Sequence, residues 1–240
     1  MSLILPQRGR IRQKPAGSPP PPSGISFVAG LDWGYDDAQE WEGPDRNKLD
    51  GIIAAGSVGD LVVLAWTFDA GADNAWSFDP DAISITTAQD GTQYIGPGLY
   101  VGYGFIGSGD LDPHLLLGTV ETSDWRGGSY CAAIFSGVDA YLGKSGDAFL
   151  GSGMPNPGNL TPGGSPALYV TTAHIDDDNI NFTAPSGWTL AAERGYSNGG
   201  YVSSTGIAYK ISTASSEDAG VWGGGGNDAN NAFTFAFSEA

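Results

Sequence analysis

Few side chains in this sequence are suited to acid–base or nucleophilic chemistry. The only histidines are His114 and His174, and the only cysteine is Cys131. Neither histidine sits in a nucleophile motif, and no Gly-x-Ser-x-Gly elbow occurs. Cys131 lies in the apolar run YCAAIF, where a free thiol is typically buried. Paired carboxylates could still serve glycoside hydrolysis, but 27 acidic residues make accidental pairs easy. We therefore expect a protein that is not an enzyme.

An acidic segment, HIDDDN, is the best candidate for metal binding. Its four oxygen-bearing side chains are Asp176, Asp177, Asp178 and Asn179. Hard oxygen ligands of this kind suit Ca²⁺, although the chain has neither EF-hand spacing nor an Asp/Gly nonapeptide repeat. The simpler interpretation is a solvated acidic turn, so the sequence indicates no required cofactor. Zinc is disfavoured by the single cysteine and two distant histidines.

Aromatic residues in loops rich in Gly, Asn and Ser are a second candidate site. The four that we select are Trp76, Trp125, Tyr201 and Trp222. Aromatic faces beside Asp and Asn can hold sugar rings, which would suit a host surface glycan. Core filling and packing between subunits are the alternative interpretations of the same residues.

The elements that must position these residues are expected to be β-strands. Glycine (38) and proline (15) are frequent among 240 residues, and hydrophobic residues make up 40%. Runs of strand length rich in Val, Ile, Thr, Phe and Tyr alternate with turn residues. The predicted strands are 25–33, 59–69, 83–88, 99–107, 114–121, 130–139, 167–176, 180–184, 188–193, 206–212 and 231–240. Only the segment 37–51 is compatible with a helical turn, so the sequence predicts an all-β sandwich.

The chain also resembles itself weakly, with half-repeats at about 57–140 and 165–240. We predict that the two halves form the paired sheets of one domain, residues 25–240, joined by a long crossover at 143–165. Two separate small sandwiches are the alternative, but half-sheets of so few strands would be marginally stable.

The first 24 residues differ from the rest and predict an extended arm. Arg8, Arg10, Arg12 and Lys14 supply four of the ten basic residues, which leaves six Lys/Arg against 27 Asp/Glu, a net −21, in residues 15–240. The prolines that follow favour a polyproline II spacer of roughly 30 Å. Partner contacts are expected from the apolar and arginine side chains of the arm. These are Leu3, Ile4, Leu5, Arg8, Arg10 and Arg12. A disordered tail is the alternative.

Charge and hydropathy exclude several partners. A body of net −21 repels phosphates, so we expect no nucleic acid binding. No stretch reaches the roughly 20 apolar residues of a membrane span, and no secretion signal is recognised at the start. We expect synthesis in a cytoplasm, no membrane insertion, and a homo-oligomer built through strand edges or the arm.

The motifs GDLVVLAW, AAIFSGVDA, APSGWTL and GIAYKISTAS carry a resemblance to a known class of protein. They resemble β-sandwich modules of tailed-phage virion proteins and some bacterial surface proteins, over roughly 57–140 and 165–240. The order departs from the usual one, because the SGVD element precedes the Pro-Ser-Gly-Trp turn. The resemblance implies a jelly-roll-like fold and a structural virion protein, bound to other virion proteins and placed in the tail fibre or tail tip, with a role in host attachment. A head decoration protein or head fibre is one alternative, and a carbohydrate-binding module of a bacterial surface protein is the other.

Overall fold

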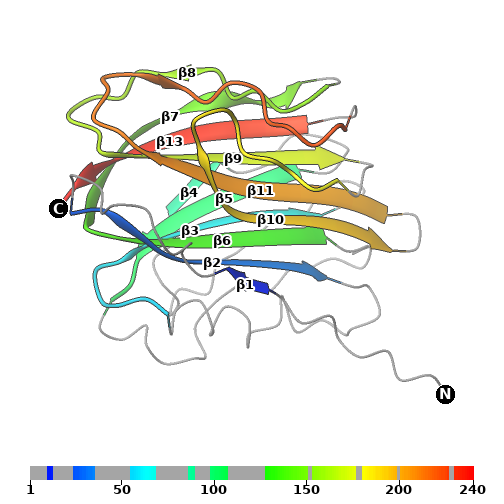
Figure 1. Ribbon diagram of the computed structural model, residues 1–240, viewed down its shortest axis with the longest axis horizontal. Helices are drawn as coiled ribbons and strands as arrows, with labels where there is room; N and C mark the ends of the chain where they lie inside the picture. The colour runs from blue at the N-terminus through cyan, green and yellow to red at the C-terminus, as the bar shows by residue number, and fades with distance from the viewer. Residues whose placement is uncertain are drawn as a thin grey trace.

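The described part of the protein is built from β-strands. The computed structural model describes residues 10–12, 24–35, 55–68, 86–89, 98–107, 128–150, 153–176, 180–198, 201–226 and 230–240. These residues form two antiparallel sheets of six and five strands and a small two-stranded sheet (Figure 1). The predicted all-β sandwich is confirmed. Within these ranges, no helix has the length and apolarity needed to cross a membrane.

The first sheet has the order β1-β2-β6-β3-β5-β4. Its strands are β1 (Arg10–Arg12), β2 (Ser26–Tyr35), β3 (Leu61–Phe68), β4 (Thr86–Gln89), β5 (Gly98–Phe105) and β6 (Gly128–Ser136). All of its neighbouring strands are antiparallel. The short strands β1 and β4 form the two edges, which is a common way of limiting edge-to-edge aggregation.

The second sheet has the order β10-β11-β9-β13-β7. Its strands are β7 (Val138–Leu150), β9 (Leu168–Asp176), β10 (Thr189–Asn198), β11 (Tyr201–Ile211) and β13 (Asn230–Glu239). The two-residue strands β8 (Asn159–Leu160) and β12 (Glu217–Asp218) pair with each other as a separate small sheet.

A single glycine marks the passage of the chain from one sheet to the other. β6 ends at Ser136, β7 begins at Val138, and Gly137 between them has φ of 74°. A Cβ at Gly137 would lie 2.5 Å from the carbonyl oxygen of Gly24, so this turn requires glycine. The described strands before Gly137 build the first sheet, and those after it build the second sheet and the small two-stranded sheet. The expected crossover was therefore placed wrongly, because β7 occupies residues 138–150.

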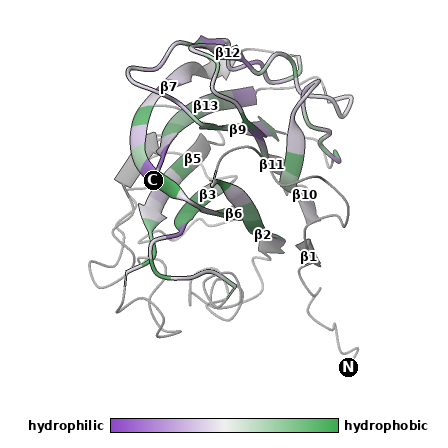
Figure 2. Ribbon diagram, turned by 60° about the vertical axis from the view of Figure 1, so that its left-hand side comes forward, coloured by the Kyte–Doolittle hydropathy of each residue, from purple (hydrophilic) through white to green (hydrophobic). Residues whose placement is uncertain are grey.

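The main core lies between the two sheets and follows from strand alternation. Leu61, Val63 and Ala65 on β3 point the same way and are buried, as are Leu168 and Val170 on β9. Aromatic side chains fill the space around them. They are Phe27, Tyr103, Phe105, Phe135, Tyr141, Tyr209, Phe233, Phe235 and Phe237. The hydrophobic segments of both sheets are green in Figure 2, whereas β12 at the top is hydrophilic.

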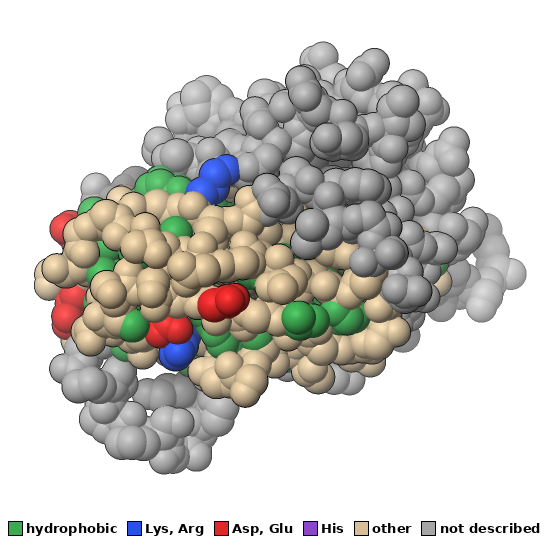
Figure 3. Space-filling model, turned by 90° about the horizontal axis from the view of Figure 1, so that it is seen from above, with side chains coloured by type: hydrophobic (Ala, Val, Ile, Leu, Met, Phe, Trp, Pro, Cys, Tyr) green, Lys and Arg blue, Asp and Glu red, His purple; other side chains and the backbone are tan. Residues whose placement is uncertain are grey.

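A second core lies on the other face of the second sheet. Tyr169, Ala173 and Ile175 of β9 are fully buried there against Phe182 and Trp222. The segment predicted as a strand at 180–184 instead forms a loop, with one isolated bridge between Thr183 and Gly223. Seen from above, the described surface shows mainly backbone and uncharged polar atoms, with scattered acidic and basic side chains and small hydrophobic patches (Figure 3).

Candidate functional site

The predicted arm contributes a strand to its own sandwich. Arg10 and Arg12 begin and end β1, which pairs antiparallel with β2 at the edge of the first sheet. The Cα register sets Arg10 opposite Asp32 and Arg12 opposite Gly30. The remaining predicted contact residues, Leu3, Ile4, Leu5 and Arg8, lie outside the described residues. The basic segment thus has a place on its own chain, where the sequence pointed to a partner.

The edge that receives β1 is polar and closely packed. Asp32 on β2 is buried, with 3% of its surface exposed, and its carboxylate lies 3.9 Å from the Arg194 guanidinium on β10. Gly30 packs so tightly that an added Cβ would lie 2.3 Å from the Ala191 carbonyl oxygen. A buried carboxylate is costly unless it is paired. We call β1, β2 and β10 the β1 strip. Asp32 of β2 and Arg194 of β10 form an ion pair there, and the backbone of β1 pairs with β2 opposite Asp32.

The acidic segment lies mostly outside the described residues. Asp176 ends β9, whereas Asp177, Asp178 and Asn179 are not described. Among the side chains that are described, no group of three or more His, Cys, Asp or Glu comes together as a metal site. The Ca²⁺ hypothesis for this segment stays a prediction.

One of the four aromatic candidates is a core residue. Trp222 has 1% of its surface exposed and packs edge-on against Phe182 with ring centroids 5.4 Å apart. Its faces are covered by protein, so the prediction of a sugar-binding surface at Trp222 is wrong. Tyr201 begins β11, and Trp76 and Trp125 lie outside the described residues.

A cluster of buried hydroxyl groups joins the two sheets, and the sequence analysis missed it. Thr67 on β3 and Ser129 on β6 face Ser203 and Thr205 on β11. The Thr205 Oγ1 lies 2.6 Å from Ser129 Oγ and 3.0 Å from Thr67 Oγ1. All four side chains are at most 1% exposed. Such a cluster stabilises one alignment of the two sheets, because sliding one sheet over the other would leave buried hydroxyls without hydrogen bonds.

His174 lies on the inner face of β9 and is fully buried. Its Nδ1 is 3.1 Å from the carbonyl oxygen of Ser204. Because a carbonyl only accepts, Nδ1 carries the hydrogen, and Nε2 is left as an acceptor without a hydrogen-bond partner. Burial lowers the pKa of His174 from 6.5 to about 4, and the bond to Ser204 opposes this shift. The ring is therefore neutral at physiological pH.

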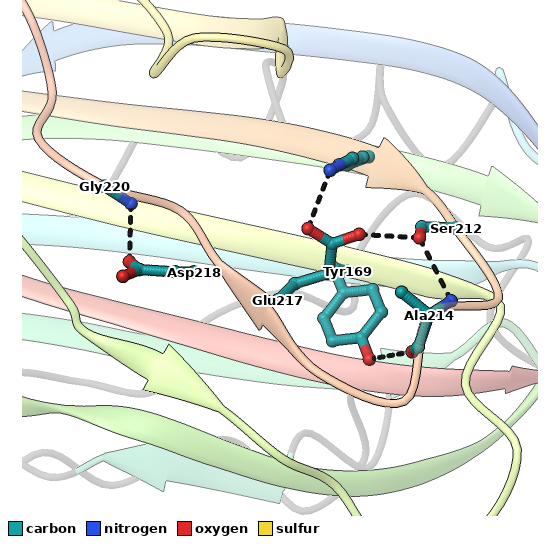
Figure 4. A network of polar contacts seen from close by, with 7 residues as sticks. Tyr169, Ser212, Ala214, Glu217, Asp218 and Gly220 are labelled. Carbon is teal, nitrogen blue, oxygen red and sulfur yellow. Dashed lines mark hydrogen bonds and ion pairs between the residues drawn. The ribbon is translucent and has the colours of Figure 1, made fainter.

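A second polar network fastens the cover over the outer core. The carboxylate of Glu217 on β12 accepts hydrogen bonds from Lys210 Nζ at 2.7 Å and Ser212 Oγ at 2.6 Å. Tyr169 donates its hydroxyl to the carbonyl oxygen of Ala214 at 2.7 Å. Figure 4 shows that these contacts connect the β12 segment to β9 and to the end of β11. Burial raises the pKa of the Tyr169 hydroxyl, and the Glu217 charge adds to that effect.

The hydroxyl cluster, His174 and the Glu217 network each have a structural role. Among the residues that the structure describes, the β1 strip is the group with a segment that a partner could share. The hydroxyl cluster and His174 are enclosed between the sheets. The Glu217 network holds the chain's own loop.

Comparison with family models, curated proteins and solved structures found no match.

Proposed function

We propose that this chain is a non-enzymatic structural protein of a tailed-phage virion. Its N-terminal segment anchors it to other virion proteins, and its β-sandwich is displayed at the particle surface. We place it in the tail fibre or tail tip, with a role in attachment to the host. The phage assignment comes from the sequence resemblance. The anchoring role is supported by the pairing of Arg10–Arg12 with the edge of a sheet.

The pairing of β1 supports anchoring because it uses main-chain hydrogen bonds. An extended segment that adds a strand to a sheet edge gains affinity from its backbone and specificity from alternate side chains. Four basic residues within residues 8–14 add attraction to a body of net −21. The amide of Gly24 also donates to the carboxylate of Glu239, so the start of the sandwich is fastened to its last strand. A sandwich held in this way is a firm base for a tethering segment.

The test measures incorporation into particles. The full chain, a variant lacking residues 1–14 and two point variants are produced during infection, and purified particles are assayed by quantitative mass spectrometry. Ile11→Pro removes a backbone donor from β1 and keeps both arginines. Arg10→Gln with Arg12→Gln removes the charges and keeps the strand.

We expect the truncated chain and Ile11→Pro to be lost from particles, while the double glutamine variant is reduced. Circular dichroism should show that all of the sandwiches remain folded. Imaging of labelled protein at the tail would support the tail assignment. Particles that lack the full chain, or that take up the truncated chain at the normal level, would overturn the proposal.

A further inference from the structure

We propose that β1 is an exchangeable strand, which in the assembled protein pairs with β2 of a second copy of this chain. The acceptor is the same edge that β1 occupies in the single chain, in the same register. This inference rests on the anchoring role proposed above and names a second copy of this chain as one of the virion proteins that the segment contacts. Its three supports are the small size of the β1 contact, the connection that follows it, and the charges at the acceptor edge.

The contact between β1 and β2 is small compared with the rest of the sheet. β1 pairs through three residues, Arg10 to Arg12, whereas β2 pairs with β6 through nine. Detaching this strand leaves the nine residue pairs between β2 and β6 in place. Exchange of so short an edge strand does not require the sandwich to unfold.

The connection between β1 and β2 is long and rich in proline. Residues 13–25 separate the two strands and include Pro15 and Pro19–Pro22. At about 3.1 Å per residue, an extended polyproline II segment of this length reaches about 40 Å, several times the roughly 10 Å spacing of packed sheets. The antiparallel pairing within one chain requires the two ends of this segment to lie close together, whereas a proline-rich linker is extended and semi-rigid. Pairing with a neighbour removes that requirement.

The charges at the edge suit a second copy. In the register, Arg10 stands opposite Asp32, which is 3% exposed and lies 3.9 Å from Arg194. Oppositely charged residues in direct cross-strand positions stabilise an antiparallel pair. Two bodies of net −21 repel each other, and a basic segment laid on the partner reduces that repulsion. The contacts at the edge are the same whether β1 pairs within its own chain or with a second copy. Protein concentration and the conformational freedom of residues 13–25 therefore decide between the two arrangements.

The experiment asks whether β1 of one chain reaches β2 of another. In a Cys131→Ala background, one chain carries Ile11→Cys and a small tag, and a second chain carries Leu31→Cys and a large tag. Ile11 and Leu31 are Cα partners, and directly opposite residues of antiparallel strands lie about 4.5 to 5.5 Å apart, within reach of a disulfide. The two chains are mixed at high concentration and oxidised. Exchange gives a covalent heterodimer that contains both tags.

Two controls define the outcome. A single chain with both Ile11→Cys and Leu31→Cys, oxidised at low concentration, should close as a monomer. The pairing of Ile11→Cys with Val58→Cys, an exposed position outside the edge, sets the background level. We expect the Ile11–Leu31 heterodimer to exceed that background at least tenfold and to increase with concentration. A heterodimer level equal to background, with the double variant closing normally, would overturn the exchange.

Leu31→Cys alters a residue that is only 5% exposed, so the substitution itself can disturb the sheet. A second measurement therefore uses no substitution in the sheet. Sedimentation velocity compares the full chain with residues 15–240 over a range of concentrations. We expect concentration-dependent oligomers of the full chain only, and identical monomers at every concentration would contradict exchange. If particles take up the full chain while both measurements fail, exchange is wrong and the anchoring proposal stands.

Discussion

The buried imidazole of His174 makes the stability of the protein depend on pH between about 4 and 6.5, mostly above the pH range in which carboxylates ordinarily titrate. The unfolded chain binds a proton at this residue with the ordinary pKa of 6.5, whereas the folded chain does so only at about 4. Between these values the unfolded state holds more protons, so stability falls as the pH is lowered. The stabilisation is fully present above pH 6.5 and is lost progressively toward pH 4.

The size of the effect follows from the two pKa values. The full separation corresponds to about 3 kcal/mol, at about 1.4 kcal/mol for each pKa unit. At about pH 5 most of the unfolded histidine is protonated and little of the folded one is, which gives a loss of about 2 kcal/mol relative to about pH 7.5. The cross-strand neighbours of His174 are Thr205 and Asn231, and neither carries a charge.

His174→Asn isolates this contribution. The asparagine amide can donate to the Ser204 carbonyl oxygen as Nδ1 does, but it does not titrate. Urea unfolding, followed by tryptophan fluorescence and circular dichroism, is measured for both proteins from about pH 7.5 to about pH 5. His114 is present in both, and so are all of the carboxylates, so they cancel in the comparison.

We expect the free energy of unfolding of the native protein to fall by about 2 kcal/mol more than that of the variant over this range. The variant is expected to be less stable at neutral pH, because the amide fills less space than the imidazole. Parallel pH profiles for the two proteins would refute the reasoning, since they would show that His174 titrates alike in the folded and unfolded states.

Three further substitutions test the packing of the sandwich. Gly30→Ala should destabilise it by more than about 2 kcal/mol in urea unfolding, because the new Cβ would lie 2.3 Å from the Ala191 carbonyl oxygen; an unchanged midpoint would contradict the close approach. Thr205→Val should cost about 1 to 2 kcal/mol in the same assay, since it removes a shared partner of buried hydroxyls, and Thr172→Val, which is equally buried and whose hydroxyl has no hydrogen-bond partner among the described residues, is the matched comparison. Glu217→Gln should speed amide exchange in residues 212–222 and leave exchange in β3 unchanged, whereas equal rates would show that the Glu217 network does not hold the cover.

The strands that the sequence predicted best are those buried on both faces. The run at 167–176 and the run at 231–240 correspond closely to β9 and β13. Near-continuous apolar and β-branched residues are typical of such strands, because neither side of the sheet is left for water. Both are central strands of the second sheet, covered on one side by the first sheet and on the other by the outer core.

β7 was missed because its composition is that of a linker. Its segment VDAYLGKSGDAFL contains Gly143 and Gly146, both with positive φ, and its pairing with β13 is interrupted by register shifts. Tertiary packing fixes it as a strand: the Tyr141 ring stacks on Tyr103 of the first sheet with centroids 4.9 Å apart. Local sequence contains no information about such a partner, since Tyr103 is far away along the chain.

The polar residues of the interior were hidden for a related reason. Ser129 and Thr67 stand in strands whose alternation shows that one face is buried, but Ser and Thr are common on either face. Only the pairing of the two sheets shows that both hydroxyls point inward, toward Thr205. Trp222 shows the converse error, because a loop rich in glycine suggested exposure while the ring fills the outer core.

The layering of the protein explains why an edge is the natural place for a partner to bind. The second sheet is buried on both faces, and the first sheet also buries Val62, Leu64, Ala132 and Ile134 on the face opposite the main core. A partner whose binding to a sheet face exposed those side chains to water would have to compensate for the lost burial. An edge offers unpaired backbone groups without that loss. Among the described strands β1 is the edge element with a basic sequence and a long connection, and these two properties favour its transfer to another chain.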